Sequence, residues 1–482
     1  MRRWLGRFGI LLGCTVLCIV VSYQYAQATQ PRHYTELTFP ELPPIQLPDY
    51  ERIELSNGLV IYLAEDRELP LVGGSALLRT GSRWEPGDQT GLAALTGQLL
   101  RSGGTTARSV DAINEFLEQR AASIETGIGT TSGSASFSTL SEDLDPVLEL
   151  FAEILRQPAF AQDRLELAKQ QYRASIARRN DNPNQVTSRE FRKVLYGDKS
   201  PYARTIEYDT LANIERADLV DYYNQYVRPD QMIIGIVGDF DKADLRQKLE
   251  TLFGDWQVGD RPLPDLPGVS QANEGVIFAV DQPQLTQSFV QLGHLGGTLD
   301  NPDLPALAVL NEVLNGPGGR LYDEVRSRQG LAYSVYGVWS AQYDYPGFFV
   351  AGGATQTETT AAFIQGIRRE IERLREVPIT AEELQQAKDS VLSSFVFNFQ
   401  RPGQTISRLM TYEYYNYPAD FIFQYQRGIE AVTSADLQRV AQQYLDPEQL
   451  VTLIVGNTDV IQPELKQELP DLPVKLIELA DD

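Results

Sequence analysis

Two residues in the second half of the chain, Arg326 and Tyr333, have side chains that could hold and polarise a peptide. They stand seven positions apart and follow a glycine-rich run that contains Gly316, Gly318 and Gly319. A guanidinium can hold a carbonyl with a forked pair of donors, and a phenol can donate to an oxyanion as it develops. The same spacing also fits a solvated helix end at Arg326 and a half-buried strand aromatic at Tyr333.

Other side chains with catalytic chemistry are scarce. The glycine-rich run predicts no nucleotide site, because no Gly-Lys-Ser/Thr follows it. The chain has two histidines, His33 and His294, and two cysteines, Cys14 and Cys18. Since both cysteines precede a predicted cleavage site, the mature chain is expected to have no thiol. His294 lies in an apolar, strand-like run and is interpreted as structural. The tyrosine-rich stretch 412–417 is either a peptide-contact surface or packed interior.

A stretch in the first half has the frame of a metal site without its ligands. An apolar, strand-like run over 77–86 leads through a polar loop to Thr90, where a helix is expected to begin. This arrangement resembles the insulinase-like metallopeptidases, the family that includes the mitochondrial processing peptidase. In active members the helix carries H-x-x-E-H, in which two His bind zinc and the Glu activates water. On this chain those positions fall on Ala94, Gly97 and Gln98, which cannot do this chemistry.

The family's third ligand, a glutamate on a later helix, falls on Ser175, 77 positions after Gln98. The run 165–176 predicts that helix, and it leads into 181–183 as the family's ligand helix does. The resemblance therefore implies that this chain holds no metal and no cofactor, and that zinc is expected in a partner.

The resemblance gives the glycine-rich run and the Arg–Tyr pair a role in the second half. In the family's C-terminal substrate motif, an Arg and a Tyr seven positions later reach the substrate near the zinc. Arg326 and Tyr333 match that spacing, and the flanking run 330–333 matches as well. Gly316 and its neighbours to 319 resemble a substrate-handling loop of non-catalytic processing-peptidase subunits. A turn that merely ends a helix explains them equally well.

The N-terminal segment, the length and the net charge of the chain indicate where the protein is located and which partners it lacks. A chain of 482 residues is expected to form at least two domains, and its net charge of −23 argues against nucleic-acid binding. A basic start, an apolar run over 8–21 and the A-x-A sequence 26–28 predict a secretory signal peptide cleaved after residue 28. An uncleaved membrane anchor is the alternative. Either way the chain is expected to be exported, as a periplasmic or otherwise extracytoplasmic protein.

The chain repeats itself, because 217–238 is echoed by 435–456 at a constant offset of 218 residues. We expect an α+β fold of two tandem α/β-roll domains, which the resemblance implies form half of a clam-shell. The predicted organisation is a signal or anchor at 1–28, an extended lead-in at 29–50, an N-terminal peptidase-like domain at 51–258, a linker at 259–270, a C-terminal peptidase-like domain at 271–460 and an acidic tail at 461–482. A strand hairpin is predicted at Asn57-Gly58.

We interpret the chain as the non-catalytic, substrate-binding subunit of an exported heterodimeric zinc metallopeptidase that acts on peptides. Its partner would be a homologous catalytic subunit with an intact H-x-x-E-H. The alternative is a binding or structural protein that kept the peptidase fold without a role in proteolysis.

Overall fold

The computed structural model describes residues 47–316 and 318–479 of the chain. The predicted signal or anchor segment and most of the predicted lead-in lie outside these residues. Within the described part, no helix combines the length and the apolar character that crossing a membrane requires.

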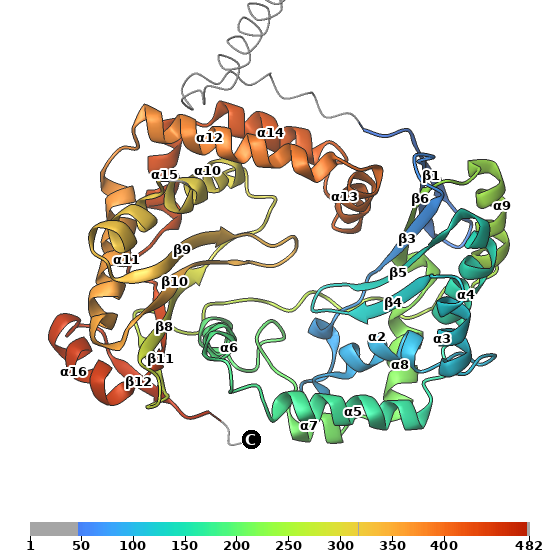
Figure 1. Ribbon diagram of the computed structural model, residues 1–482, viewed down its shortest axis with the longest axis horizontal. Helices are drawn as coiled ribbons and strands as arrows, with labels where there is room; N and C mark the ends of the chain where they lie inside the picture. The colour runs from blue at the N-terminus through green and yellow to red at the C-terminus, as the bar shows by residue number, and fades with distance from the viewer. Residues whose placement is uncertain (1–46, 317, 480–482) are drawn as a thin grey trace, which may run out of the picture. The chain divides into compact units, whose positions relative to one another are not determined.

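The first half forms a six-stranded sheet backed by helices (Figure 1). Its strands lie in the spatial order β1 (Tyr50–Glu54), β2 (Val60–Glu65), β6 (Met232–Gly238), β3 (Leu71–Leu78), β5 (Gly133–Leu140) and β4 (Ser123–Ile128). The helices are α2 (Leu92–Ser102), α3 (Val110–Glu118), α4 (Leu144–Arg156), α5 (Gln162–Ile176), α6 (Pro183–Tyr196), α7 (Tyr208–Ala212), α8 (Arg216–Tyr226) and α9 (Lys242–Phe253). The central strand β6 is an almost continuous apolar run, as expected for a strand that is covered on both faces.

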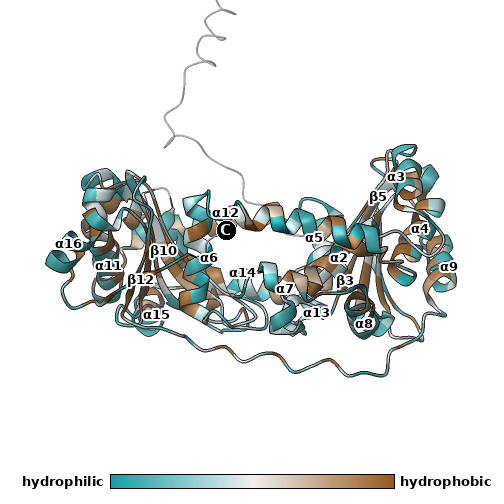
Figure 2. Cartoon of the chain, turned by 90° about the horizontal axis from the view of Figure 1, so that it is seen from below, coloured by the Kyte–Doolittle hydropathy of each residue, from teal (hydrophilic) through white to brown (hydrophobic). Residues whose placement is uncertain are grey.

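The second half forms another six-stranded sheet. Its spatial order is β12 (Val474–Ile477), β7 (Ile277–Asp281), β11 (Val451–Gly456), β8 (Gln287–Leu295), β10 (Phe348–Gln356) and β9 (Ala332–Ser340). Its helices are α10 (Leu304–Asn315), the π-helical turn η6 (Tyr322–Arg328), α11 (Thr360–Glu376), α12 (Ala381–Phe395), α13 (Pro402–Tyr414), α14 (Phe421–Ala431), α15 (Ser434–Tyr444) and α16 (Thr458–Glu468). Figure 2 shows both teal and brown residues on the labelled helices of this half, and in α11 the buried apolar residues Phe363, Ile367 and Ile371 recur at a helical spacing, as an amphipathic helix requires.

The two sheets share the arrangement of all strands except one edge strand, since β1 pairs antiparallel with β2 whereas β12 pairs parallel with β7. Strand β6 pairs parallel with β2 and antiparallel with β3, and β11 pairs in the same way with β7 and β8. The internal repeat predicted from the sequence is therefore confirmed. Both sheets also place a late hairpin strand at the same edge, β4 in one and β9 in the other.

Each half lends a helix to the other half's sheet. Helix α6 packs on β8 and β11 through Phe191 and Leu195, while α13 packs on β2, β3 and β6 through Ile406 and Met410. The contact at β6 is close, because a Cβ on Gly235 would lie 2.4 Å from the Met410 sulfur. Glycine at position 235 therefore lets α13 pack closely on β6 of the other half.

Local predictions fare differently. The hairpin at Asn57-Gly58 is confirmed, with β1 antiparallel to β2 and Gly58 at φ +82. The strand-like run 77–86 is wrong beyond Leu78, because the chain turns at Gly81 into a short 3-10 turn over Ser82–Trp84. A Cβ on Gly81 would lie 2.2 Å from the Thr130 carbonyl oxygen, which shows how tightly the chain turns.

The acidic tail predicted over 461–482 is also wrong for much of its length. Residues in this range complete α16 and supply β12, which pairs parallel with β7. Val474 and Leu472 pack against the core of the second half, and this apolar contact holds the segment on the sheet. The other predicted domain boundaries stay predictions.

Candidate functional site

Arg326 and Tyr333 lie together at one edge of the second sheet. The guanidinium carbon of Arg326 is 5.1 Å from the centre of the Tyr333 ring and 4.4 Å from that of Tyr322. Tyr333 is 85% exposed and Tyr322 40% exposed. The three side chains therefore form a stack of a cation between two aromatic rings, a favourable arrangement.

The local backbone brings these side chains together. Tyr322 and Arg326 stand four residues apart in the π-helical turn η6, so they occupy neighbouring positions on one face of the turn. After Gly330, at φ +65, the chain enters β9 with a bulge: Ala332 and Ser334 pair with consecutive residues of β10, and Tyr333 is the extra residue. Bulges re-aim side chains, which explains why Tyr333 points to solvent. The alternative of a half-buried strand aromatic is therefore wrong in its burial.

Arg326 differs from its neighbours in its electrostatic partners. Arg328, two residues on, pairs with Glu324 at 3.0 Å. Among the described residues, no carboxylate or other hydrogen-bond acceptor lies against the Arg326 guanidinium, which contacts only the two rings. A cation without a counter-ion, in a chain of net charge −23, is available to a ligand.

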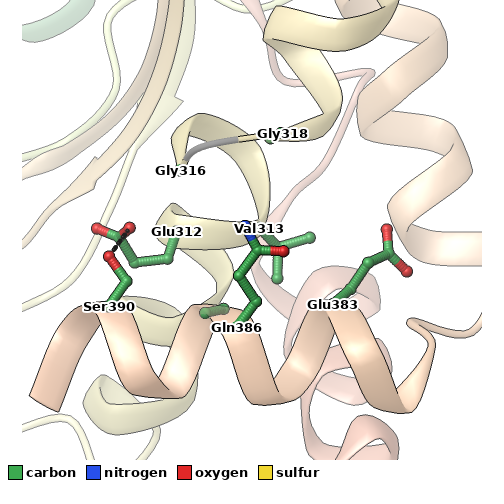
Figure 3. Close-up of a pocket in the computed structure, with 9 residues that line it drawn as sticks. Glu312, Val313, Gly316, Gly318, Glu383, Gln386 and Ser390 are labelled. Atoms are coloured by element: carbon green, nitrogen blue, oxygen red, sulfur yellow. Dashed lines mark hydrogen bonds between the residues drawn. The ribbon is translucent and has the colours of Figure 1, made fainter. Parts of the chain in front are cut away.

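The glycine-rich run is a turn between α10 and η6. Gly316 ends α10 and donates its N–H to the Glu312 carbonyl, and Gly318 has φ +77. Figure 3 shows this turn above α12, with Ser390 donating to the Glu312 carboxylate at 2.8 Å. The cavity between them measures about 30 Å³, which is room for one water. Ending a helix is what the structural alternative required, and a substrate role for Gly316, Gly318 and Gly319 stays a prediction.

An ion pair between the buried Arg320 and the partly exposed Glu383 anchors this turn to α12. Arg320 donates to Glu383 at 2.8 and 3.2 Å and is only 7% exposed. The hydrogen bonds from Arg320 lower the pKa of Glu383 to about 2. The pair therefore stays ionised at neutral pH and fixes the start of η6.

The helix with the degenerate zinc motif, α2, begins as predicted. Gly91 precedes it at φ +112, and the buried Glu85 carboxylate accepts the N–H groups of Gly91 at 3.1 Å and Ala93 at 2.8 Å. A carboxylate at a helix N-terminus stabilises the helix. Burial nevertheless raises the pKa of Glu85 above its ordinary value, because it outweighs those two hydrogen bonds.

Gly97, at the position of the family's catalytic glutamate, packs directly on the edge strand β4. A Cβ on it would lie 2.2 Å from the Ile128 nitrogen, and the Thr126 hydroxyl donates to the Gly97 carbonyl at 2.7 Å. The strand therefore occupies the space that a longer side chain would need.

The remaining zinc positions do not form a donor set. Gln98 contacts Gln171 at 3.4 Å, while Ser175, one turn further along α5, is exposed and donates its hydroxyl back to the Gln171 carbonyl. Ala94 supplies a methyl group. Across the described residues, no group of three or more His, Cys, Asp or Glu side chains is placed to hold a metal. These side chains do not fit a zinc ion, which prefers imidazole, thiolate and carboxylate ligands.

His294 and the tyrosine-rich stretch have structural environments. His294 is buried against Phe349 and its Nδ1 meets the Leu295 carbonyl at 2.8 Å, while burial lowers its pKa. Tyr414 is buried and donates its hydroxyl to the carbonyls of Leu78 and Thr131, which belong to the first half. Interior packing, one of the two interpretations of residues 412–417, therefore describes this tyrosine.

Sequence reasoning missed Tyr322. The signal was its position four residues before Arg326, a spacing that makes two side chains neighbours on a helix face.

Two sequence models of one peptidase family match the chain. The model described as "Insulinase (Peptidase family M16)" matches residues 75–208, and "Peptidase M16 inactive domain" matches residues 213–391. The chain belongs to the insulinase-like family. The match to the inactive domain begins inside the first half, before β6, and continues into α12 of the second half.

The relatives in this family have divided names. "Uncharacterized zinc protease YmxG" of Bacillus subtilis is 24% identical over 362 residues, which is 74% of this chain and 86% of that protein. "Non-peptidase homolog YmxG" of Helicobacter pylori is 23% identical over 417 residues, 85% of this chain and 94% of that protein. One name denotes a protease and the other its inactive counterpart.

Solved structures have the same fold. The M16 inactive domain of Pseudomonas fluorescens superposes with a TM-score of 0.75 at 25% identity, covering 85% of this chain and 98% of that chain. The periplasmic protease PqqL of Escherichia coli gives 0.73 at 16% identity over 89% of this chain and 48% of that chain. The predicted fold of tandem insulinase-like α/β domains is confirmed.

Proposed function

We propose that this chain is the non-catalytic, substrate-binding subunit of an exported heterodimeric zinc metallopeptidase. A homologous partner with an intact H-x-x-E-H supplies the metal. This chain contributes Arg326 and Tyr333 to the peptide bound at the partner's site.

The observation that carries the proposal is the exposed stack of Arg326 between Tyr322 and Tyr333. A chain that had lost every link to peptides would be expected to pair or bury such a cation. Here the cation has no carboxylate against it among the described residues, and the tyrosine hydroxyl beside it faces solvent.

The two side chains suit different stages of peptide hydrolysis. A guanidinium can hold a peptide carbonyl before the reaction starts, so Arg326 contributes to binding. The hydroxyl of Tyr333 can donate to the oxyanion that appears only in the transition state, so it contributes to rate. At the position of the water-activating glutamate of active members this chain has Gly97, which has no side chain that could take this role.

Export is part of the proposal. It rests on the predicted signal at 1–28, and the periplasmic location printed for PqqL is compatible with it. Analysis of the mature N-terminus tests it: a chain that begins at Thr29 supports a cleaved signal, and retention of 1–28 supports the anchor.

Kinetics of the reconstituted pair test the function. Tyr333→Phe should lower kcat by roughly 100-fold, the scale for losing one oxyanion donor, while assembly is unchanged. Tyr336→Phe is the matched control, because its hydroxyl accepts a hydrogen bond from Gln291 within the protein. Equal kinetics for wild type and Tyr333→Phe would contradict the proposal and favour a binding or structural protein that is unconnected with proteolysis.

A further inference from the structure

A cavity of about 510 Å³ lies where the loop before α2, the end of α6 and the start of α7 meet. Three basic side chains line it, Lys193, Lys199 and Arg204, together with two acidic ones, Asp198 and Glu207. Glycine and threonine make up the rest of the lining. Ligand sites have volumes of about 300 to 1,000 Å³ and are usually lined by apolar side chains, so this cavity suits a hydrophilic ligand instead.

Arg204 is a cation of this lining that the backbone holds in place. Its Nη2 donates to the carbonyls of Ser82 at 2.8 Å and Glu85 at 2.6 Å, whereas its Nη1 makes no hydrogen bond among the described residues. A Cβ on Gly87 would lie 3.5 Å from Nη1, so with glycine there no side chain from position 87 covers this nitrogen. Burial lowers the pKa of Arg204 despite the charge of nearby Glu85. The guanidinium is therefore positioned by neutral carbonyls, and one of its nitrogens is available to a ligand.

Lys199 is the second available cation. Its side chain is exposed, and in the part of the chain that the structure describes no carboxylate or other acceptor lies against its ammonium. Lys193 differs, because its ammonium pairs with the buried Glu190 at 3.2 Å. The cations that a ligand can use are therefore Arg204 and Lys199.

The two acidic side chains of the lining differ in the same way. Glu207 accepts hydrogen bonds from Arg179 at 2.5 Å and from the Thr205 hydroxyl at 2.7 Å. Asp198 is exposed, and no donor within the described residues lies against it. The available groups are thus two cations and one carboxylate, with one positive charge in excess. This set matches a ligand that carries a single negative charge next to a hydrogen-bond donor.

We propose that this cavity binds the C-terminal end of a peptide. The terminal carboxylate accepts hydrogen bonds from Nη1 of Arg204 and from the Lys199 ammonium, and Asp198 accepts a backbone N–H of the same peptide. Hydrogen bonds between ionised groups are the stronger ones, and capture of a terminal carboxylate is one mode of peptide recognition. Inorganic phosphate matches less well, because it offers Asp198 no backbone N–H. The inference rests on the proposed function, since it names the end of the peptide that this subunit holds, but its test needs neither the partner nor catalysis.

Binding of two forms of one peptide gives the direct test. A short polyserine peptide, acetylated at its N-terminus, is titrated into the mature chain with a free C-terminal carboxylate and, separately, with a C-terminal amide. We expect the carboxylate form to bind about tenfold more tightly, because the amide removes the negative charge that the two cations hold. Equal affinities for the two forms would overturn the proposal.

Variants of the two exposed lining residues sharpen this test. Lys199→Gln should weaken binding of the carboxylate form about tenfold and leave the amide form unchanged. Asp198→Asn keeps an acceptor but removes a negative charge, so it should tighten binding of the carboxylate form about threefold. Lys466→Gln is the control, since it changes the net charge equally at an exposed position of α16 that does not line the cavity. Similar losses for Lys199→Gln and Lys466→Gln would overturn the proposal.

Three outcomes separate this inference from its alternatives. If inorganic phosphate binds as tightly as the carboxylate peptide and displaces it, the cavity is a general oxyanion site and the proposal fails. If the carboxylate peptide binds as expected but Tyr333→Phe leaves turnover of the heterodimer unchanged, the C-terminal site stands and the proposed function fails. If Tyr333→Phe lowers turnover but both peptide forms bind equally, the proposed function stands and this inference fails.

Discussion

The α2–β4 corner of the first half and the α10–β9 corner of the second half have the same topology but opposite surfaces. In the first corner, Gly97 lets the helix touch the strand backbone, so no side chain reaches out from there. In the second corner, Asn311 and Asn315 hold the helix beside the strand through their carboxamides. In the first corner the position of the family's catalytic glutamate is packed against β4. In the second corner Tyr333 is exposed beside Arg326.

The first corner therefore differs from a metal site in its packing as well as in its ligands. At Gly97 the Ile128 backbone occupies the space that a glutamate side chain would need. The neighbouring Gln98 contacts Gln171 on α5. In the second half, by contrast, the Arg326 guanidinium lies over two tyrosine rings and Tyr333 is exposed.

The largest expected effect concerns the arginines of η6. Arg326→Ala should lower kcat/KM of the heterodimer about 10- to 100-fold, because a charge-assisted hydrogen bond to the peptide is lost. Arg328→Ala is the matched control on the same turn, since Arg328 pairs with Glu324. Similar losses for both variants would indicate a general effect of surface charge and would remove the special position of Arg326.

The closed corner can be broken by adding one methyl group. Gly97→Ala should lower the free energy of unfolding by about 1 to 3 kcal/mol, because its Cβ overlaps the β4 backbone. Gly127→Ala is the control from the neighbouring strand, where a Cβ would meet no atom within 4 Å. Urea unfolding of both variants measures the difference, and equal stabilities would mean that α2 does not depend on this contact.

The anchor of the glycine-rich turn has a pH signature. Glu383→Gln should cost about 1 to 2 kcal/mol at neutral pH, since it leaves the buried Arg320 without its counter-ion. The folded pKa of about 2 lies below the unfolded value of about 4.3. The contribution is therefore complete above the unfolded pKa and disappears as the pH falls toward the folded one.

Unfolding at about pH 5 and about pH 3 tests this sign. The stability difference between wild type and Glu383→Gln should shrink at the lower pH, whereas the exposed neighbour Glu382→Gln should match wild type at both. A difference that grows on acidification would contradict the assignment of the ion pair.

The smallest effect is expected at the former zinc helix surface. Gln98→Ala should change stability by less than about 0.5 kcal/mol, because a 3.4 Å contact between exposed amides contributes little. A loss as large as that of Gly97→Ala would mean that the Gln98–Gln171 contact has replaced the metal as a cross-link.

The sequence predicted the features that depend on local pattern. The repeat offset of 218 gave two sheets of matched strand order, Asn57-Gly58 gave the hairpin, and the loop before Leu92 gave the start of α2. The spacing and the flanking residues singled out Arg326 and Tyr333, but their mutual contact was not predicted, and their role at a substrate stays a prediction.

Features that depend on distant packing did not follow from the sequence. The exchange of α6 and α13 between halves joins residues far apart in the chain, and neither helix announces which sheet it will cover. The exposure of Tyr333 depends on a bulge, and the contact of Gln98 with Gln171 rather than Ser175 depends on how α5 lies against α2. The segment 461–482 was interpreted as an acidic tail, whereas the packing of its apolar residues, such as Leu465 and Val474, on the core depends on distant parts of the chain.

The zinc content of the mature chain tests the central claim most directly. The chain would be equilibrated with zinc, desalted in the presence of a mild chelator and analysed by mass spectrometry for metal per polypeptide. We expect far less than one zinc per chain, because Ala94, Gly97, Gln98 and Ser175 provide no set of ligands. One tightly held zinc per chain would contradict this view of the protein as a peptidase-like subunit without metal chemistry of its own.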